Sequence, residues 1–135
     1  MNSTLEKIIL AIPLERRTEN EEFANNSFYT QNGTMPGDYI EALTIYHGGA
    51  GGVGEFYIDL WEPKEIFQLN KEYRVEDFAP GFTIFGSDGG DVAFAFERTT
   101  GHIYEFPFIG MTMDDPASLI SESFEGFLVT LKGED

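Results

Sequence analysis

The stretch PGFTIFGSDGGDVAFAFE, residues 80–97, decides the fold class. Residues 82–85 are apolar or β-branched and predict a strand, and the glycine-rich run 86–90 predicts a turn. Beyond the turn, large apolar side chains alternate with alanine over residues 92–96, and this period of two is typical of a strand. The stretch therefore predicts two antiparallel strands joined by a short turn.

Two further segments extend this predicted sheet. Residues 99–101, Thr-Thr-Gly, suit a tight hairpin loop, and residues 102–108 predict the strand that returns from it. Earlier in the chain, Phe, Ile and Leu alternate with Tyr and Asp over residues 56–60, which predicts another strand. We expect the large residues of these strands to share one core with the last helix, namely Phe56, Ile58, Leu60, Val92, Phe94 and Phe96 against Phe124, Phe127, Leu128 and Leu131.

Helical segments flank the predicted strands. Capping residues, prolines at helix starts and apolar spacings of three and four carry this prediction. The predicted segments are residues 3–12 ended by Pro13, a short turn from Thr18 to Phe23, residues 38–47 after Pro36, a helix opened by Pro63, and a last helix from Asp115 to Leu131. Helices and strands do not alternate as in βαβ units, so we expect an α+β fold with a mostly antiparallel sheet of four or more strands packed against helices.

The composition limits the possible function. With 135 residues, the chain is expected to form a single domain over residues 1–135. It has no cysteine, which excludes disulfides, zinc-thiolate sites and cysteine nucleophiles. No signal peptide and no membrane span are predicted, so we expect a cytoplasmic protein.

The charge balance favours a particular kind of partner. Twenty-four acidic residues against eight basic ones give a formal net charge of −16. This charge repels phosphate backbones and anionic membrane surfaces, so nucleic acid and membranes are excluded as partners. A basic protein would be attracted instead, although solubility alone is an equally good explanation of the acidity.

No motif in the sequence predicts catalysis or cofactor binding. Residues 49–54, GAGGVG, match G-x-G-x-x-G, but a predicted helix precedes them and a strand follows, so we interpret them as a helix-to-strand connection. Asp88 and Asp91 lack the spacing of a calcium loop and suit turn chemistry. Neither His47 nor His102 belongs to a metal-spaced motif. We predict no catalytic residue, no cofactor and no metal.

Several segments, in their order along the chain, resemble the SUKH superfamily of Smi–Knr type. The similarity covers about residues 35–131, while residues 1–34 lack the usual family pattern and His47 stands where the family has Asn. The segments that carry it are MPGDY at 35–39, HGG at 47–49, YIDL at 57–60, EPKEI at 62–66, PGFTIFGSDGG at 80–90 and SESFEGFL at 121–128. The resemblance implies a protein-interaction module or a bacterial immunity protein that binds and neutralises a toxin, with no family active site.

The leading hypothesis is therefore a non-enzymatic protein-binding module, an immunity protein whose partner is a basic toxin. A regulatory scaffold of the cell-wall-synthesis-regulator type and a carboxylate-dependent hydrolase are the alternatives. The predicted partner-binding side chains are acids near the glycine-rich turn and the sheet edge, with one aromatic anchor: Glu55, Asp59, Asp88, Asp91, Glu97 and Trp61. The competing interpretation places Trp61 in the core and gives the acids a solubilising role only.

Overall fold

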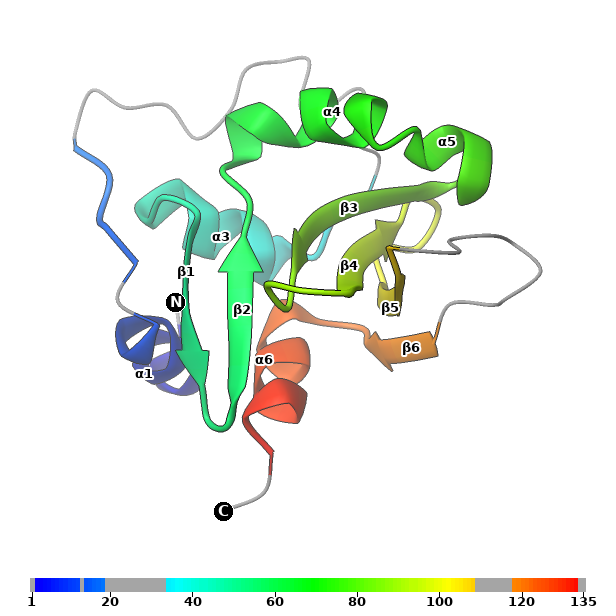
Figure 1. The fold of residues 1–135 in the computed structure, drawn as a ribbon. Helices are drawn as coiled ribbons and strands as arrows, with labels where there is room; N and C mark the ends of the chain where they lie inside the picture. Colours follow the sequence, from blue (N-terminus) through cyan, green and yellow to red (C-terminus); the bar gives the residue numbers. More distant parts are fainter. Residues whose placement is uncertain (1, 13, 19–33, 109–117, 134–135) are drawn as a thin grey trace.

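The computed structural model describes residues 2–12, 14–18, 34–108 and 118–133 (Figure 1). Six strands form one sheet in the order β1-β2-β3-β4-β5-β6, and every neighbouring pair is antiparallel. The strands are β1 Gly49–Val53, β2 Phe56–Leu60, β3 Phe82–Ser87, β4 Val92–Glu97, β5 Ile103–Pro107 and β6 Ser118–Ser121. The helices of the described ranges are α1 Ser3–Ala11, α3 Gly37–Ile45, α4 Pro63–Glu72, α5 Val75–Phe78 and α6 Phe124–Lys132. The predicted α+β class with an antiparallel sheet is confirmed.

The sheet carries a hydrophobic cluster on each of its faces. The larger cluster joins β2, β3 and β4 to helices α1, α3 and α6, and its centre is a group of rings: Tyr39, Phe85, Phe94, Phe96, Phe124 and Phe127. The smaller cluster joins the opposite face of the sheet to α5 through Val75 and Ala79. In Figure 1, α4 and α5 run along the top of the sheet, away from α1 and α6. The sheet is therefore covered on both faces.

Helix α4 completes the sheet edge that β2 leaves open. Strand β2 pairs with β3 only through Asp59 with Ser87 and Leu60 with Gly86, so the first half of β3 has no strand on that side. The Asn70 amide takes the place of a strand there. Its Oδ1 accepts from the Ile84 amide at 2.7 Å, and its Nδ2 donates to the Ile84 carbonyl at 2.8 Å. One side chain thus satisfies both backbone groups that the missing strand would have paired.

The interpretation of residues 49–54 as a helix-to-strand connection was wrong, because residues 49–53 form strand β1. The glycines permit close backbone contact, which is why they occur in a strand despite their low strand propensity. A Cβ on Gly51 would lie 2.5 Å from the carbonyl oxygen of Ile12, just past the end of α1. Gly54 adopts φ +63°, and a Cβ there would lie 2.5 Å from the Lys132 carbonyl oxygen at the end of α6.

The predicted last helix was wrong in its first part. Residues 118–121 form β6 on β5, with Tyr104 opposite Leu119, and helix α6 begins only at Phe124. The Ser123 hydroxyl caps the helix by accepting from the Gly126 amide at 3.0 Å. The apolar spacing of residues 119 and 120 fits a helix as well as a strand, and pairing with β5 decides between them. The predicted helix start at Asp115 and Pro116 lies outside the described residues.

The remaining helix predictions were largely confirmed. Helix α1 is capped by Asn2, whose Oδ1 accepts from the Leu5 amide at 2.9 Å. Helix α3 ends at Ile45, two residues before the predicted end, because Tyr46 pairs with Arg16 in an isolated bridge. Helix α5 was not predicted. The predicted short turn from Thr18 to Phe23 lies, apart from Thr18, outside the described residues.

The predicted core was correct apart from Phe56 and, in part, Val92. The other large residues named for β2, β4 and α6 are buried together, and Val92 is half-buried against them. Phe56 is 55% exposed. It lies at the tip of the β1–β2 hairpin, which extends beyond β3, and the described helices do not cover it. Within the ranges that the structure describes, no helix combines the length and apolar character that a membrane crossing needs.

Candidate functional site

Four of the six predicted binding residues gather at one end of the sheet. Asp59 lies opposite Ser87, directly beside Asp88 in the β3–β4 turn. The carbonyl of Asp91, in the same turn, accepts from the Phe108 amide at 2.8 Å. Trp61 stacks on Phe108 with ring centroids 6.4 Å apart. We call this surface, formed by Asp59, Trp61, Asp88 and Asp91, the acidic sheet end.

Glu55 and Glu97 lie elsewhere. Glu55 is exposed in the β1–β2 turn, at the opposite end of β2 from Trp61. Glu97 is the last residue of β4, and its Oε1 accepts from the Thr100 hydroxyl at 2.8 Å in the next hairpin loop. Glu97 is six residues from Asp91 along β4, about 20 Å, and Glu55 is four residues from Asp59 along β2, about 13 Å, so we leave both carboxylates outside the acidic sheet end.

Asp88 shapes the turn in which it lies. Its Oδ1 accepts from the Gly90 amide at 2.8 Å and from the Val92 amide at 3.1 Å. These two bonds are the turn chemistry expected of an aspartate before glycines. Asp88 therefore contributes negative charge and also holds the loop, whereas the Asp91 side chain is exposed.

Trp61 is part of a stack of three rings. Its ring lies 5.8 Å from that of Tyr73, near parallel at 16°, and the Tyr73 ring lies 5.2 Å from that of Phe108. Trp61 is half-buried and contacts both hydrophobic clusters, while Tyr73 is 47% exposed. The exposed Tyr73 ring is joined to the acidic sheet end through Phe108, whose amide donates to the Asp91 carbonyl. Aromatic faces and carboxylates together favour arginine and lysine side chains.

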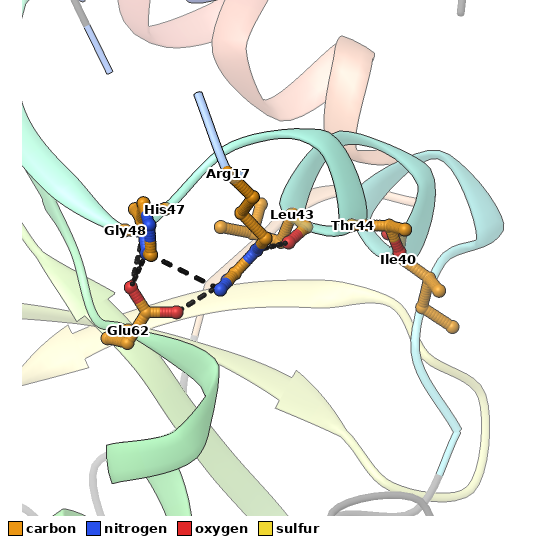
Figure 2. Close-up of polar contacts among 7 residues, drawn as sticks. All are labelled: Arg17, Ile40, Leu43, Thr44, His47, Gly48 and Glu62. Atoms are coloured by element: carbon orange, nitrogen blue, oxygen red, sulfur yellow. Dashed lines mark hydrogen bonds and ion pairs between the residues drawn. The ribbon is translucent and has the colours of Figure 1, made fainter. Parts of the chain in front are cut away.

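A second polar cluster, centred on Glu62, was not predicted (Figure 2). Glu62 Oε1 accepts from Arg17 Nη2 at 2.5 Å, and Oε2 accepts from His47 Nδ1 at 2.9 Å and from the Gly48 amide at 3.2 Å. Arg17 Nε also donates to the Leu43 carbonyl at 2.7 Å. The side chain of Arg17 is only 3% exposed, against 24% for Glu62. Both carboxylate oxygens thus accept from protein donors, which favours a structural role.

Backbone hydrogen bonds around this cluster show which segments of the chain it joins. The Arg17 amide donates to the Ile45 carbonyl at 2.9 Å, and the His47 amide donates to the Glu15 carbonyl at 2.8 Å. Residues 14–18 therefore lie along the end of α3, and Glu62 ties both to the start of α4. No spacing in the sequence signals this contact, because Arg17 and Glu62 are 45 positions apart.

The hydrogen bonds assign the proton on His47. A carboxylate only accepts, so Nδ1 must donate to Glu62. The 3.4 Å contact between Arg17 Nη1 and His47 Nδ1 then joins two donors and is not a hydrogen bond. His47 therefore acts as a fixed donor that orients the Glu62 carboxylate.

Tyr39 lies next to this cluster in the core. Burial is the main cause that raises the pKa of Tyr39 far above its ordinary value, and the Glu62 carboxylate adds to the effect while the Arg17 guanidinium opposes it. The hydroxyl is buried and has no hydrogen-bond partner among the described residues. Tyr39 thus stays neutral at physiological pH.

In the ranges that the structure describes, His, Cys, Asp and Glu side chains form no group of three or more suited to a metal ion. The two polar sites therefore differ in kind: the Glu62 cluster ties segments together, and the acidic sheet end displays charge and aromatic surface.

The fold and these sites define an α+β protein with a six-stranded antiparallel sheet covered by helices on both faces. The family model described as SMI1 / KNR4 family (SUKH-1) matches residues 20–130, well over half of the chain. The chain belongs to this family, which confirms the superfamily predicted from the sequence. No curated protein matched the chain.

Proposed function

We propose that this member of the SUKH-1 family is a non-catalytic protein-binding module, an immunity protein that neutralises a basic bacterial toxin. The observation that carries the proposal is the acidic sheet end, where Asp59, Asp88 and Asp91 share one end of the sheet and Asp91 is bonded through its carbonyl to Phe108 of the Trp61–Tyr73–Phe108 ring stack. The net charge of −16 supports it, because a field of this sign attracts a basic partner over long distances.

The geometry suits recognition of cationic side chains. The backbone of Asp59 is held on β2, and the Asp88 carboxylate is held by hydrogen bonds within its turn, so the acidic sheet end is ordered before a partner arrives. Preorganised groups lose little conformational freedom on binding, which leaves more of the interaction energy for affinity. An arginine that stacks on Tyr73 and pairs with Asp91 would use both chemistries of this surface.

The test first asks whether a gene next to this protein's gene encodes a candidate toxin, and then uses the product of that gene. We expect the two proteins to co-purify and the toxin to lose its activity in cells. The variant Asp59→Asn/Asp91→Asn should weaken capture strongly, whereas Glu6→Gln/Glu72→Gln removes the same charge from α1 and α4 and should weaken it much less. Asp88 is left unchanged because its loss would also disturb the turn.

Each part of this test has an outcome that would contradict the proposal. Equal capture by both double variants would remove the acidic sheet end from the proposal. A neighbouring toxin that binds but stays active, or the absence of a toxin gene, would favour the regulatory scaffold. Turnover of a glycosidase or esterase substrate that depends on a single carboxylate would favour the hydrolase.

A further inference from the structure

A cavity of about 360 Å³ lies between α4, α5 and the beginning of β3, away from the acidic sheet end. Its apolar walls are Phe67, Val75 and Phe82, and its charged groups are Lys71, Glu76 and Arg98. Strand β3 runs from this cavity at Phe82 to the acidic sheet end beyond Ser87, a span of about 17 Å. The cavity is thus a separate feature of the molecule.

The cavity walls are fixed by the fold. Asn70 also lines the cavity, and its bonds to Ile84 hold α4 against β3. The Phe82 ring packs edge-on against Tyr104 at 5.3 Å and Phe106 at 5.7 Å, so its position does not depend on a ligand. Small-molecule sites are usually preformed cavities of this kind, mostly apolar and about 300–1,000 Å³ in volume.

The net charge of the side chains that line the cavity is opposite in sign to the net charge of the chain. Lys71 and Arg98 are two of only eight basic residues, and both line this one cavity. Arg98 is paired with Glu76 at the cavity wall. Lys71 has no ion pair among the described residues, so two cations and one carboxylate leave a net charge of +1. The net charge of the whole chain is −16, so this small positive charge at the cavity does not serve the protein's solubility.

We propose that this cavity binds an organic monoanion, a single carboxylate attached to an aromatic or branched aliphatic body. The Lys71 ammonium pairs with the carboxylate, and the body lies between Phe67 and Phe82. Phe67 is 47% exposed, so a bound apolar group removes part of its ring from water. The single unpaired cation selects a monoanion over a dianion.

The ligand's chemistry has two natural sources, a free organic acid or the C-terminal residue of a polypeptide. The probes are therefore 3-phenylpropanoate and 4-methylpentanoate, each with its neutral amide, and pentapeptides that end in Phe or Leu as free acids or as amides. Binding is followed by backbone amide NMR shifts of residues 67–83 during titration to millimolar concentration. Stronger binding of the small acids indicates a free ligand, and stronger binding of the peptides indicates a polypeptide C-terminus.

The expected result is that acids bind and amides bind at least about tenfold more weakly, as the loss of a charged hydrogen bond implies. Lys71→Gln should remove this preference, whereas Lys64→Gln, on the same helix but outside the cavity, should keep it. Phe67→Ala should weaken all acids, whereas Phe56→Ala should not. Both variants alter exposed side chains, so the fold is retained.

Three outcomes would overturn the proposal. The first is that no acid in the set shifts the resonances of residues 67–83. The second is that acids and amides bind equally. The third is that Lys64→Gln weakens binding as much as Lys71→Gln does. None of these outcomes bears on the toxin-binding proposal, because the acidic sheet end is unchanged in every variant.

Discussion

Arg17 donates to Glu62 at 2.5 Å across 45 positions of sequence, and this bond holds the segment 14–18 to the rest of the fold. Replacement of Arg17 by Met keeps the apolar stem but removes the donors to Glu62 and Leu43. Glu62 would keep His47 and Gly48 as partners. We expect a loss of about 2–3 kcal/mol in the free energy of unfolding, the cost of charged hydrogen bonds in a buried setting.

Urea denaturation measures this loss, and Arg16→Met is the matched control. Arg16 is exposed and pairs with Tyr46 through its backbone alone, so its replacement should change stability by less than about 0.5 kcal/mol. Equal effects of the two variants would show that the Arg17–Glu62 pair does not hold the segment.

Tyr39 should confer a loss of stability at alkaline pH. Its pKa is raised in the folded state, so the folded protein keeps the proton that the unfolded chain releases above about pH 10. Unfolding then becomes easier by about 1.4 kcal/mol for each further pH unit. The contribution of Tyr39 is fully present below pH 10 and is lost as the pH rises.

Tyr39→Phe tests this expectation. The hydroxyl is buried without a partner among the described residues, so its removal should leave stability at pH 7 unchanged or raise it by up to about 1 kcal/mol. The urea midpoints of the two proteins should diverge further between pH 9.5 and 11. Parallel pH profiles would assign the alkaline loss to other groups.

Asn70 should contribute more to the free energy of unfolding than an ordinary polar side chain of a helix. Asn70→Ala leaves the Ile84 amide and carbonyl unpaired at a buried position, and each unpaired group costs about 1–3 kcal/mol. Hydrogen exchange should show faster exchange of the Ile84 amide. Gln68→Ala on the same helix is the control, since its side chain contacts only the exposed Glu72.

Phe124 tests the core that the sequence predicted. It is fully buried and packs edge-on against Tyr39 at 5.3 Å, so Phe124→Ala should cost about 3–5 kcal/mol. Phe56→Ala, at the exposed hairpin tip, should cost less than about 0.5 kcal/mol. A thermal or urea melt compares the two, and a similar loss in both would contradict the assignment of the core.

The sequence predicted most of the fold because apolar periodicity reports burial directly. Alternation identified β4 at residues 92–96 and β2 at residues 56–60, whereas residue types and turn signals identified β3 and β5. It failed at β1, where glycines replace the apolar residues that mark a strand. Those glycines form a strand because they pair with β2, and Gly51 must be glycine because the end of α1 lies against it; local patterns contain neither contact.

The sequence was enough to name most residues of the candidate site, but it did not show which of them lie together on one surface. Asp88 and Asp91 lie three positions apart, so their proximity follows from the turn. Asp59 joins them only through its register with Ser87, which no local pattern encodes. Tyr73 was missed because its neighbours Trp61 and Phe108 come from other parts of the chain.

Association with the proposed basic partner should depend steeply on salt. At a net charge of −16, long-range attraction speeds the encounter, and salt screens it over a Debye length of about 10 Å at 0.1 M and 3 Å at 1 M. We expect the association rate to fall at least about tenfold between 0.02 and 0.5 M salt, while the dissociation rate changes less. Stopped-flow or surface-binding kinetics separate the two rates. Asp59→Asn/Asp91→Asn should also raise the dissociation rate, because those carboxylates contact the partner in the proposed complex, whereas Glu6→Gln/Glu72→Gln should slow association only. An association rate that is constant across this salt range would show that the acidity serves solubility and not recognition.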